Sequence, residues 1–160
     1  MIRARIWGGL GNQMFQYAMV YSLAEKNKTK LALDTSFFYE KHKNIRVTQR
    51  NFGLLKFPGI DQSMCVEIKN KSKKIEVLQI PLINYALRKV GNGYVKIGNY
   101  ILETRYQYHS RLLEETNPNL YLDGYWHCEK YFTNVKDSII SLFSFEDDQI
   151  LQEYNRIVDL

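Results

Sequence analysis

The chain has 160 residues, of which 45% are hydrophobic and 24% charged. A chain of this size can bury one substantial core, and the composition excludes a disordered or low-complexity protein. The net charge of +5 favours anionic ligands or surfaces without selecting among phosphorylated sugars, nucleic acids and lipid headgroups. No apolar run reaches the roughly 18 residues of a membrane-spanning helix, and residues 1–7 are not followed by the apolar core of a signal peptide. We therefore expect a cytoplasmic domain.

The first 34 residues predict a βαβ unit. Apolar and polar residues alternate over 2–7, as in a strand, and glycines 8, 9 and 11 then form a tight turn. Apolar residues recur at helical spacing from Gln13 to Ala24, and Asn12 is placed to cap this helix. A short apolar run over 31–34 predicts a second strand beside the first.

The rest of the chain predicts further alternating elements. We expect strands over 75–80, 94–102 and 120–125, a helix over 81–90, and a helix beginning near Glu129 or Thr133. A last helix is predicted from Gln149, and its apolar stripe, which favours self-association, consists of Ile150, Tyr154, Ile157 and Val158.

Cysteine and histidine spacing gives no indication of a metal site. Cys65 and Cys128 lie far apart, so we expect two reduced thiols without a bridge. The three histidines, His42, His109 and His127, have neither HxxxH spacing nor a CxxC partner.

The glycine turn is the strongest chemical signal in the sequence. A strand, a glycine turn and a helix in succession present free backbone N–H groups to a phosphate or a polar ligand. A dinucleotide fingerprint fails because Met14 occupies the third glycine position, and no Lys-Ser or Lys-Thr pair completes a P-loop. Two interpretations remain: a turn that only connects strand and helix, or a site in which the amides of Asn12 and Gln13 orient sugar hydroxyls.

Three ordered segments then resemble a known family. They are GGLGNQMFQYA at 8–18, LDTSFF at 33–38 and YLDGYWHCEKYF at 121–132. Together they are similar to the bacterial α-1,2-fucosyltransferases of glycosyltransferase family 11. His127 and Cys128 stand where the family usually has Gln and Ser, and the family's H-x-R-R-x-D motif, whose arginine is implied to hold the donor phosphate, does not occur in the 160 residues.

The resemblance implies an α/β fold, a Rossmann-like three-layer half-domain of a GT-B type glycosyltransferase. Residues 1–160 would be the amino-terminal domain, ending before the GDP-fucose-binding domain, and we expect this chain to be inactive alone. The implied reaction is inverting transfer of fucose from GDP-fucose to the 2-hydroxyl of a galactose residue on a glycan, with no metal or other cofactor. The implied setting is polysaccharide or O-antigen synthesis, with peripheral contact at the inner face of the membrane.

The same resemblance assigns the site. Asn12 would be catalytic, and the substrate-binding residues would be Gly9, Gly11, Gln13, Tyr125 and Trp126. The last two would form an aromatic platform for the acceptor galactose, although at least one of them is expected in the core. Arg5 would support phosphate or form an ion pair, and Asp34 would be a cleft acid or a cap. The alternative function is a carbohydrate- or nucleotide-binding module without turnover. No nucleic-acid partner is expected.

Overall fold

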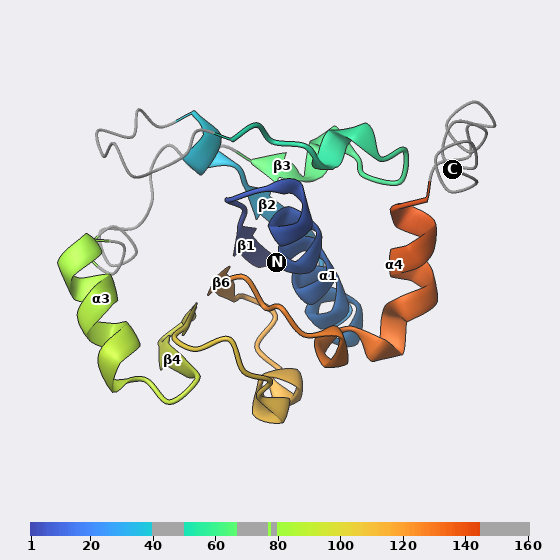
Figure 1. Cartoon of the computed structure of the whole chain (residues 1–160). Helices are drawn as coiled ribbons and strands as arrows, with labels where there is room; N and C mark the ends of the chain where they lie inside the picture. The colour runs from blue at the N-terminus through green and yellow to red at the C-terminus, as the bar shows by residue number, and fades with distance from the viewer. Residues whose placement is uncertain (40–49, 67–76, 78–79, 145–160) are drawn as a thin grey trace, which may run out of the picture.

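A computed structural model describes residues 1–39, 50–66, 77 and 80–144 of the chain (Figure 1). Its strands are β1 (Ile2–Arg5), β2 (Leu31–Asp34), β3 (Cys65–Val66), β4 (Tyr94–Ile97), β5 (Tyr100–Glu103) and β6 (Tyr121–Asp123). The α-helices are α1 (Leu10–Lys26), α3 (Pro81–Val90) and α4 (Lys136–Leu142). Short 3-10 helices are η1 (Ser36–Phe38), η2 (Leu54–Lys56), η3 (Gln62–Met64), η4 (Ser110–Glu114), η5 (Glu129–Tyr131) and η6 (Thr133–Val135).

The predicted βαβ unit is confirmed. β1 and β2 pair in parallel, with Ile2 opposite Leu31 and Arg5 opposite Asp34. α1 begins at Leu10, three residues before the predicted start, because the chain turns sharply at Gly8 and becomes helical after Gly9. The N-cap is therefore Gly9, without a side-chain bond, and the expectation that Asn12 caps the helix is wrong.

The described strands form one six-stranded sheet in the order β3-β2-β1-β6-β5-β4. The pairs from β3 to β5 are parallel, and only β4 is antiparallel, to β5. The single strand expected over 94–102 is instead the β4–β5 hairpin, because Gly98 adopts a positive φ of 62° and reverses the chain. The fold is the expected Rossmann-like, mostly parallel α/β arrangement.

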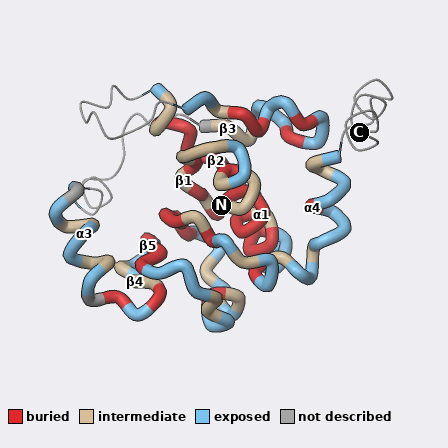
Figure 2. Tube along the Cα trace, in the orientation of Figure 1, coloured by how far each residue is buried: buried red, intermediate tan, exposed pale blue. Residues whose placement is uncertain are grey.

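The two faces of the sheet carry different side chains because neighbouring strand residues point to opposite faces. One face packs against α1 in the main core, to which the strands contribute Ile2, Ala4, Leu33, Ile101 and Leu122. The other face meets α3 at the β5 end, where Ile83 and Leu87 pack on Tyr100, Leu102 and Tyr121. Figure 2 shows the buried segments gathered in β1, β2, β5 and α1. The expected three layers are thus α1, the sheet and α3.

The region after β6 is less regular than predicted. The helix expected near Glu129 or Thr133 is split into η5, η6 and the short α4. The helix over 81–90 is confirmed as α3. Of the strand expected over 75–80, only residues 77 and 80 are described; Val77 is helical and Ile80 is the N-cap of α3, so the expectation of a strand is wrong at both. The helix expected from Gln149, with its apolar stripe, lies outside the described residues. Within the described part of the chain, no helix is both long and apolar enough to cross a membrane.

Candidate functional site

The candidate site lies where β1 and β6 end side by side. These parallel neighbours lead into the glycine turn and into the segment 124–128, respectively. The chain moves from β1 to β2 and β3 on one side, and returns through β4 and β5 to β6 on the other. The strand order therefore reverses between β1 and β6, and open α/β sheets bind their ligands at the carboxyl ends of the strands at such a point.

The glycines of the turn differ in what surrounds them. Gly8 has φ +83°, and a Cβ added there would lie 2.7 Å from the Asn12 amide nitrogen and 3.3 Å from the Tyr125 ring. A Cβ at Gly9 or Gly11 would meet no described atom within 4 Å. Gly8 therefore allows the packing of the turn itself, whereas Gly9 and Gly11, two of the predicted binding residues, leave space that a ligand can approach.

Asn12 joins the two loops of the site. As the third residue of α1 it projects from the helix towards the segment after β6, and its Oδ1 lies 2.9 Å from Nε2 of His127. The predicted catalytic residue and the residue that departs from the family pattern are thus direct partners.

Gln13, predicted to bind substrate, is completely buried and uses its amide within the protein. Its Nε2 donates to the backbone oxygens of Gly8 and Asn51, each at 3.0 Å, and its Oε1 accepts from the backbone N–H of Gly53 at 2.9 Å. Gln13 therefore ties the glycine turn to the loop at 51–53.

The predicted aromatic pair is divided between core and site. Trp126 is 1% exposed and packs in the core, whereas Tyr125 is half-buried at the site. Trp126 has a positive φ of 57°, a conformation uncommon for a side chain of this size. Its backbone N–H and that of Tyr125 donate to the Glu103 carboxylate, the latter at 2.6 Å. This turn brings the rings of Tyr125 and His127 face to face, with centroids 5.0 Å apart and planes 10° apart.

A row of rings continues on both sides of Tyr125. Trp7 stacks on it with centroids 4.1 Å apart, and the exposed Tyr106 lies 5.9 Å from both Tyr125 and His127. Phe15 contacts His127 edge-on at 5.2 Å. Because Trp7 and His127 both stack on the Tyr125 ring, its faces are already occupied by protein rings and do not form the expected open platform. The sequence analysis did not predict Trp7 or Tyr106 as residues of the site. For Trp7, its position directly before the glycines was the signal that could have indicated this role.

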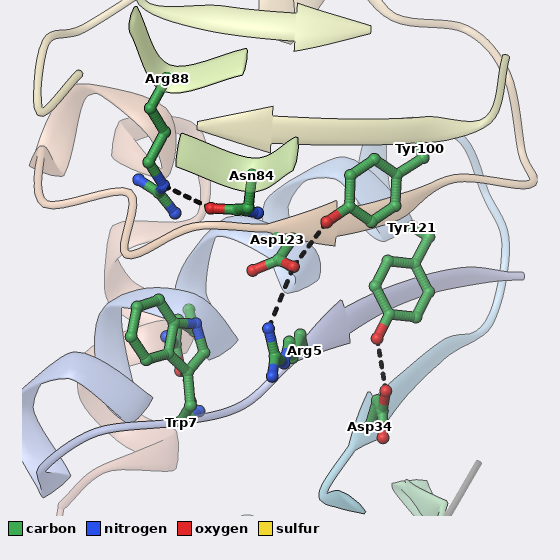
Figure 3. Close-up of polar contacts among 9 residues, drawn as sticks. Arg5, Trp7, Asp34, Asn84, Arg88, Tyr100, Tyr121 and Asp123 are labelled. Carbon is green, nitrogen blue, oxygen red and sulfur yellow. Dashed lines mark hydrogen bonds and ion pairs between the residues drawn. The ribbon is translucent and has the colours of Figure 1, made fainter. Parts of the chain in front are cut away.

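A buried polar network holds the strand ends beneath the site (Figure 3). Arg5 pairs with Asp123 at 3.3 Å, and the Tyr100 hydroxyl donates to the same carboxylate at 2.6 Å. On β2, the Tyr121 hydroxyl donates to Asp34, which also accepts from the backbone N–H of Ser36. Burial, followed by the neighbouring carboxylates, raises the pKa of both tyrosines far above its ordinary value.

This network shows the surroundings of two residues, Arg5 and Asp34, whose roles the sequence left open. The ion pair is the observed environment of Arg5, whose guanidinium carbon also lies 5.9 Å from the Trp7 ring. The carboxylate of Asp34 is fully buried and caps the turn at Ser36. Both residues therefore support the site from below. Burial is also the main reason that the pKa of Glu103, which holds the β6 loop, is raised.

The described residues contain no cluster of three or more His, Cys, Asp or Glu side chains that could hold a metal ion. Cys65 and Cys128 are free thiols. A cavity of about 330 Å³ lies away from the predicted site residues and is lined by Asn92, Tyr94, Tyr108, His109, Ser110 and Arg111.

Comparison with known proteins gives two relatives. The α-1,2-colitosyltransferase of Escherichia coli is 28% identical over 149 residues, which are 90% of this chain and 45% of that protein. The O-antigen biosynthesis glycosyltransferase WbnK of E. coli is 31% identical over 151 residues, 88% of this chain and 47% of WbnK. The chain matches no family model and no solved structure. It thus spans about half the length of these relatives, and the resemblance drawn from its motifs is confirmed as distant homology to two bacterial glycosyltransferases.

Proposed function

We propose that this chain forms one half of an inverting α-1,2-fucosyltransferase that uses GDP-fucose as donor and the 2-hydroxyl of a galactose residue as acceptor. The observation that carries the proposal is the meeting of the glycine turn, Asn12 and His127 at the switch point of a Rossmann-like sheet, in a chain homologous to glycosyltransferases. The second half of the enzyme would supply the groups that bind the donor diphosphate.

The chemistry needs a positioned acceptor and a stabilised leaving group. The acceptor oxygen forms a bond to the anomeric carbon while the bond from that carbon to the phosphate oxygen breaks. The electron pair of the broken bond leaves with GDP, and the hydroxyl proton passes to a base. Neutral amide and N–H donors at the turn can stabilise oxygens that gain negative charge in this step, with no metal required.

A transfer assay tests the proposal. The chain alone, and a fusion of residues 1–160 to the part of WbnK that it does not match, are incubated with labelled GDP-fucose and a galactoside. We expect no appreciable transfer by the chain alone, because positioning and charge stabilisation supply most of such catalysis, and transfer by the fusion. Asn12→Ala should lower that transfer, whereas Asn92→Ala, an exposed asparagine at the separate cavity, should not.

The donor sugar has a second candidate, because one relative is a colitosyltransferase. The same fusion is therefore assayed with GDP-colitose. If the fusion transfers colitose faster than fucose, colitose replaces fucose as the proposed donor sugar and the proposed reaction class is unchanged. A folded fusion that binds a galactoside but transfers neither sugar would favour the non-catalytic binding module instead.

We further propose that α3 contacts an anionic membrane surface. Its exposed side includes Leu82 and Tyr85, which are 76% and 59% exposed, and Ile80 precedes it at 46%. Lys89 lies over the Tyr85 ring at 5.4 Å, and Arg88 and Lys89 occupy the last turn of α3. Apolar side chains on a helix that ends in basic residues suit the boundary between acyl chains and anionic headgroups.

Vesicle sedimentation tests this contact. The chain should sediment with vesicles that contain phosphatidylglycerol and stay in solution with phosphatidylcholine alone. Leu82→Asp should weaken sedimentation, and Ile140→Asp, at a 54% exposed position on α4, serves as the matched control. Equal loss in both variants, or sedimentation that does not depend on lipid charge, would contradict the proposal.

A further inference from the structure

The contact between Asn12 and His127 fixes the direction of a hydrogen bond. Oδ1 of Asn12 can only accept, so a hydrogen bond with Nε2 of His127, 2.9 Å away, requires the tautomer in which Nε2 carries the proton and donates it. Partial burial lowers the pKa of the His127 ring, so the neutral ring prevails at pH 7. In that form Nδ1 has the lone pair and Nε2 remains the donor.

The same bond orients the rest of the Asn12 amide. With Oδ1 held by the segment after β6, the amide nitrogen lies above Gly8, at 2.7 Å from the position that a Cβ of Gly8 would occupy. The adjacent positions Gly9 and Gly11 have no described atom in the space of their missing side chains. The amide nitrogen of Asn12 therefore lies against Gly8, the neighbour in sequence of Gly9, where a ligand has room.

The ring that makes this bond belongs to an exposed residue but contacts three other rings. Tyr125 stacks on one face, Phe15 meets the ring edge-on, and Tyr106 lies alongside. The left-handed backbone at Trp126, held by Glu103, sets the direction from which His127 arrives. Such contacts reduce the rotamer freedom that would otherwise weaken a surface hydrogen bond.

We propose that His127 is a positioning residue, which holds the Asn12 amide so that its nitrogen donates to a substrate oxygen above the glycine turn. This inference rests on the proposed glycosyltransferase function. His127 is then required as a hydrogen-bond donor at one point in space, and a glutamine, whose side-chain amide also donates, can replace it. A role as the base that takes the acceptor proton would require the imidazole itself.

The positioning can be measured in the chain as it is, without turnover. In ¹⁵N-labelled protein, the ring nitrogens of His127 should show the Nε2–H tautomer alone, and Asn12→Ala should restore the mixture of the two neutral tautomers found in a free imidazole. The heteronuclear NOE of the Asn12 side-chain amide should be high in the wild type and in His127→Gln, and should fall in His127→Phe. The Asn27 amide, held by Leu23 and Glu115, is the internal reference and should not change.

Two outcomes of the NMR measurement would overturn the proposal: an Nδ1–H tautomer in the wild type, or an Asn12 amide as ordered in His127→Phe as in the wild type. A fusion without transfer activity would count against the proposed function. The NMR measurement would still show whether His127 positions the Asn12 amide.

Catalysis then separates positioning from base catalysis. In the active fusion, His127→Gln should keep kcat within about threefold of the wild type, and His127→Phe should lower kcat by about 10- to 100-fold, the scale of a misplaced transition-state donor. The double variant with Asn12→Ala should lose little more than Asn12→Ala alone, because the two residues act as a unit. Equal inactivation by Gln and Phe would refute positioning in favour of the base.

Discussion

Substituting the three glycines of the turn one at a time separates packing from ligand access. Gly8→Ala places a Cβ 2.7 Å from the Asn12 amide nitrogen, at a residue with φ +83°. Gly9 has φ −74°, which any residue adopts, and Gly11 lies within α1. Only the first substitution should therefore disturb the fold.

The sizes of these effects follow from the local geometry. A side chain in the left-handed region costs about 1–2 kcal/mol, and moving the Asn12 amide away from the new methyl group breaks the bond to His127, worth about 0.5–1.5 kcal/mol. Gly8→Ala should thus lower the free energy of unfolding by about 2–3 kcal/mol, and the Tm by about 5–10 °C. Gly11→Ala should raise stability by about 0.5–1 kcal/mol through helix propensity. In Gly9→Ala the lower entropy of the unfolded chain is offset by the loss of glycine at the N-cap of α1, so the net change should be small.

Thermal unfolding followed by circular dichroism at pH 7 measures all three variants. A Gly8→Ala variant whose Tm lies within about 1 °C of the wild type, or a Gly9→Ala variant destabilised as much as Gly8→Ala, would refute the argument from geometry. If Gly9→Ala and Gly11→Ala keep their stability but reduce transfer by the fusion, the added methyl groups occupy space that the ligand needs.

Other predictions concern buried polar groups and pH. Gln13→Ala strands three backbone partners and should cost roughly 3 kcal/mol in denaturant unfolding, whereas Gln107→Ala, at an exposed position, should be neutral. Burial raises the pKa of Tyr17 and of Tyr131 to about 12. The stability that depends on their neutral hydroxyls should therefore be complete below about pH 10 and lost between pH 10 and 12. Ionisation of these two tyrosines at pH 10 in the folded state, monitored by absorbance at 295 nm, would contradict this. Partial burial lowers the pKa of His127 below 6.5, so as the pH falls this ring takes up a proton in the unfolded chain before it does so in the folded chain. Protonation should therefore reduce the free energy of unfolding as the pH falls through 6.5 and below. An NMR titration midpoint of His127 at or above 6.5 would be inconsistent with its partial burial.

The elements that the sequence predicted correctly are those whose signals are continuous along the chain. β1, α1 and β2 follow from alternation, helical spacing and a glycine turn within the first 34 residues. The β4–β5 hairpin was missed because Gly98 lies inside an otherwise regular strand pattern, and only its positive φ reveals the turn.

The site was predictable in its glycines and in Asn12, but not in the partners of these residues. His127 lies 115 positions from Asn12, and no periodicity connects them; their contact requires β1 and β6 to be neighbours in the sheet. The sequence predicts that at least one of Tyr125 and Trp126 lies in the core but does not say which; the structure places Trp126 there, with a left-handed backbone conformation. The positions of His127 and Trp126 thus depend on long-range strand pairing and on one unusual backbone angle, and the motif alone predicts neither.

The chain contains two tryptophans, and their placement gives the protein two separate optical reporters. Trp126, 1% exposed within the core, should emit at short wavelength and resist quenching by iodide until the domain unfolds. Trp7 stacks on Tyr125 with centroids 4.1 Å apart, so its emission should respond to any ligand that moves the ring row. In a Trp126→Phe variant the remaining fluorescence comes from the candidate site alone, and a sugar or nucleotide titration can be followed without a label.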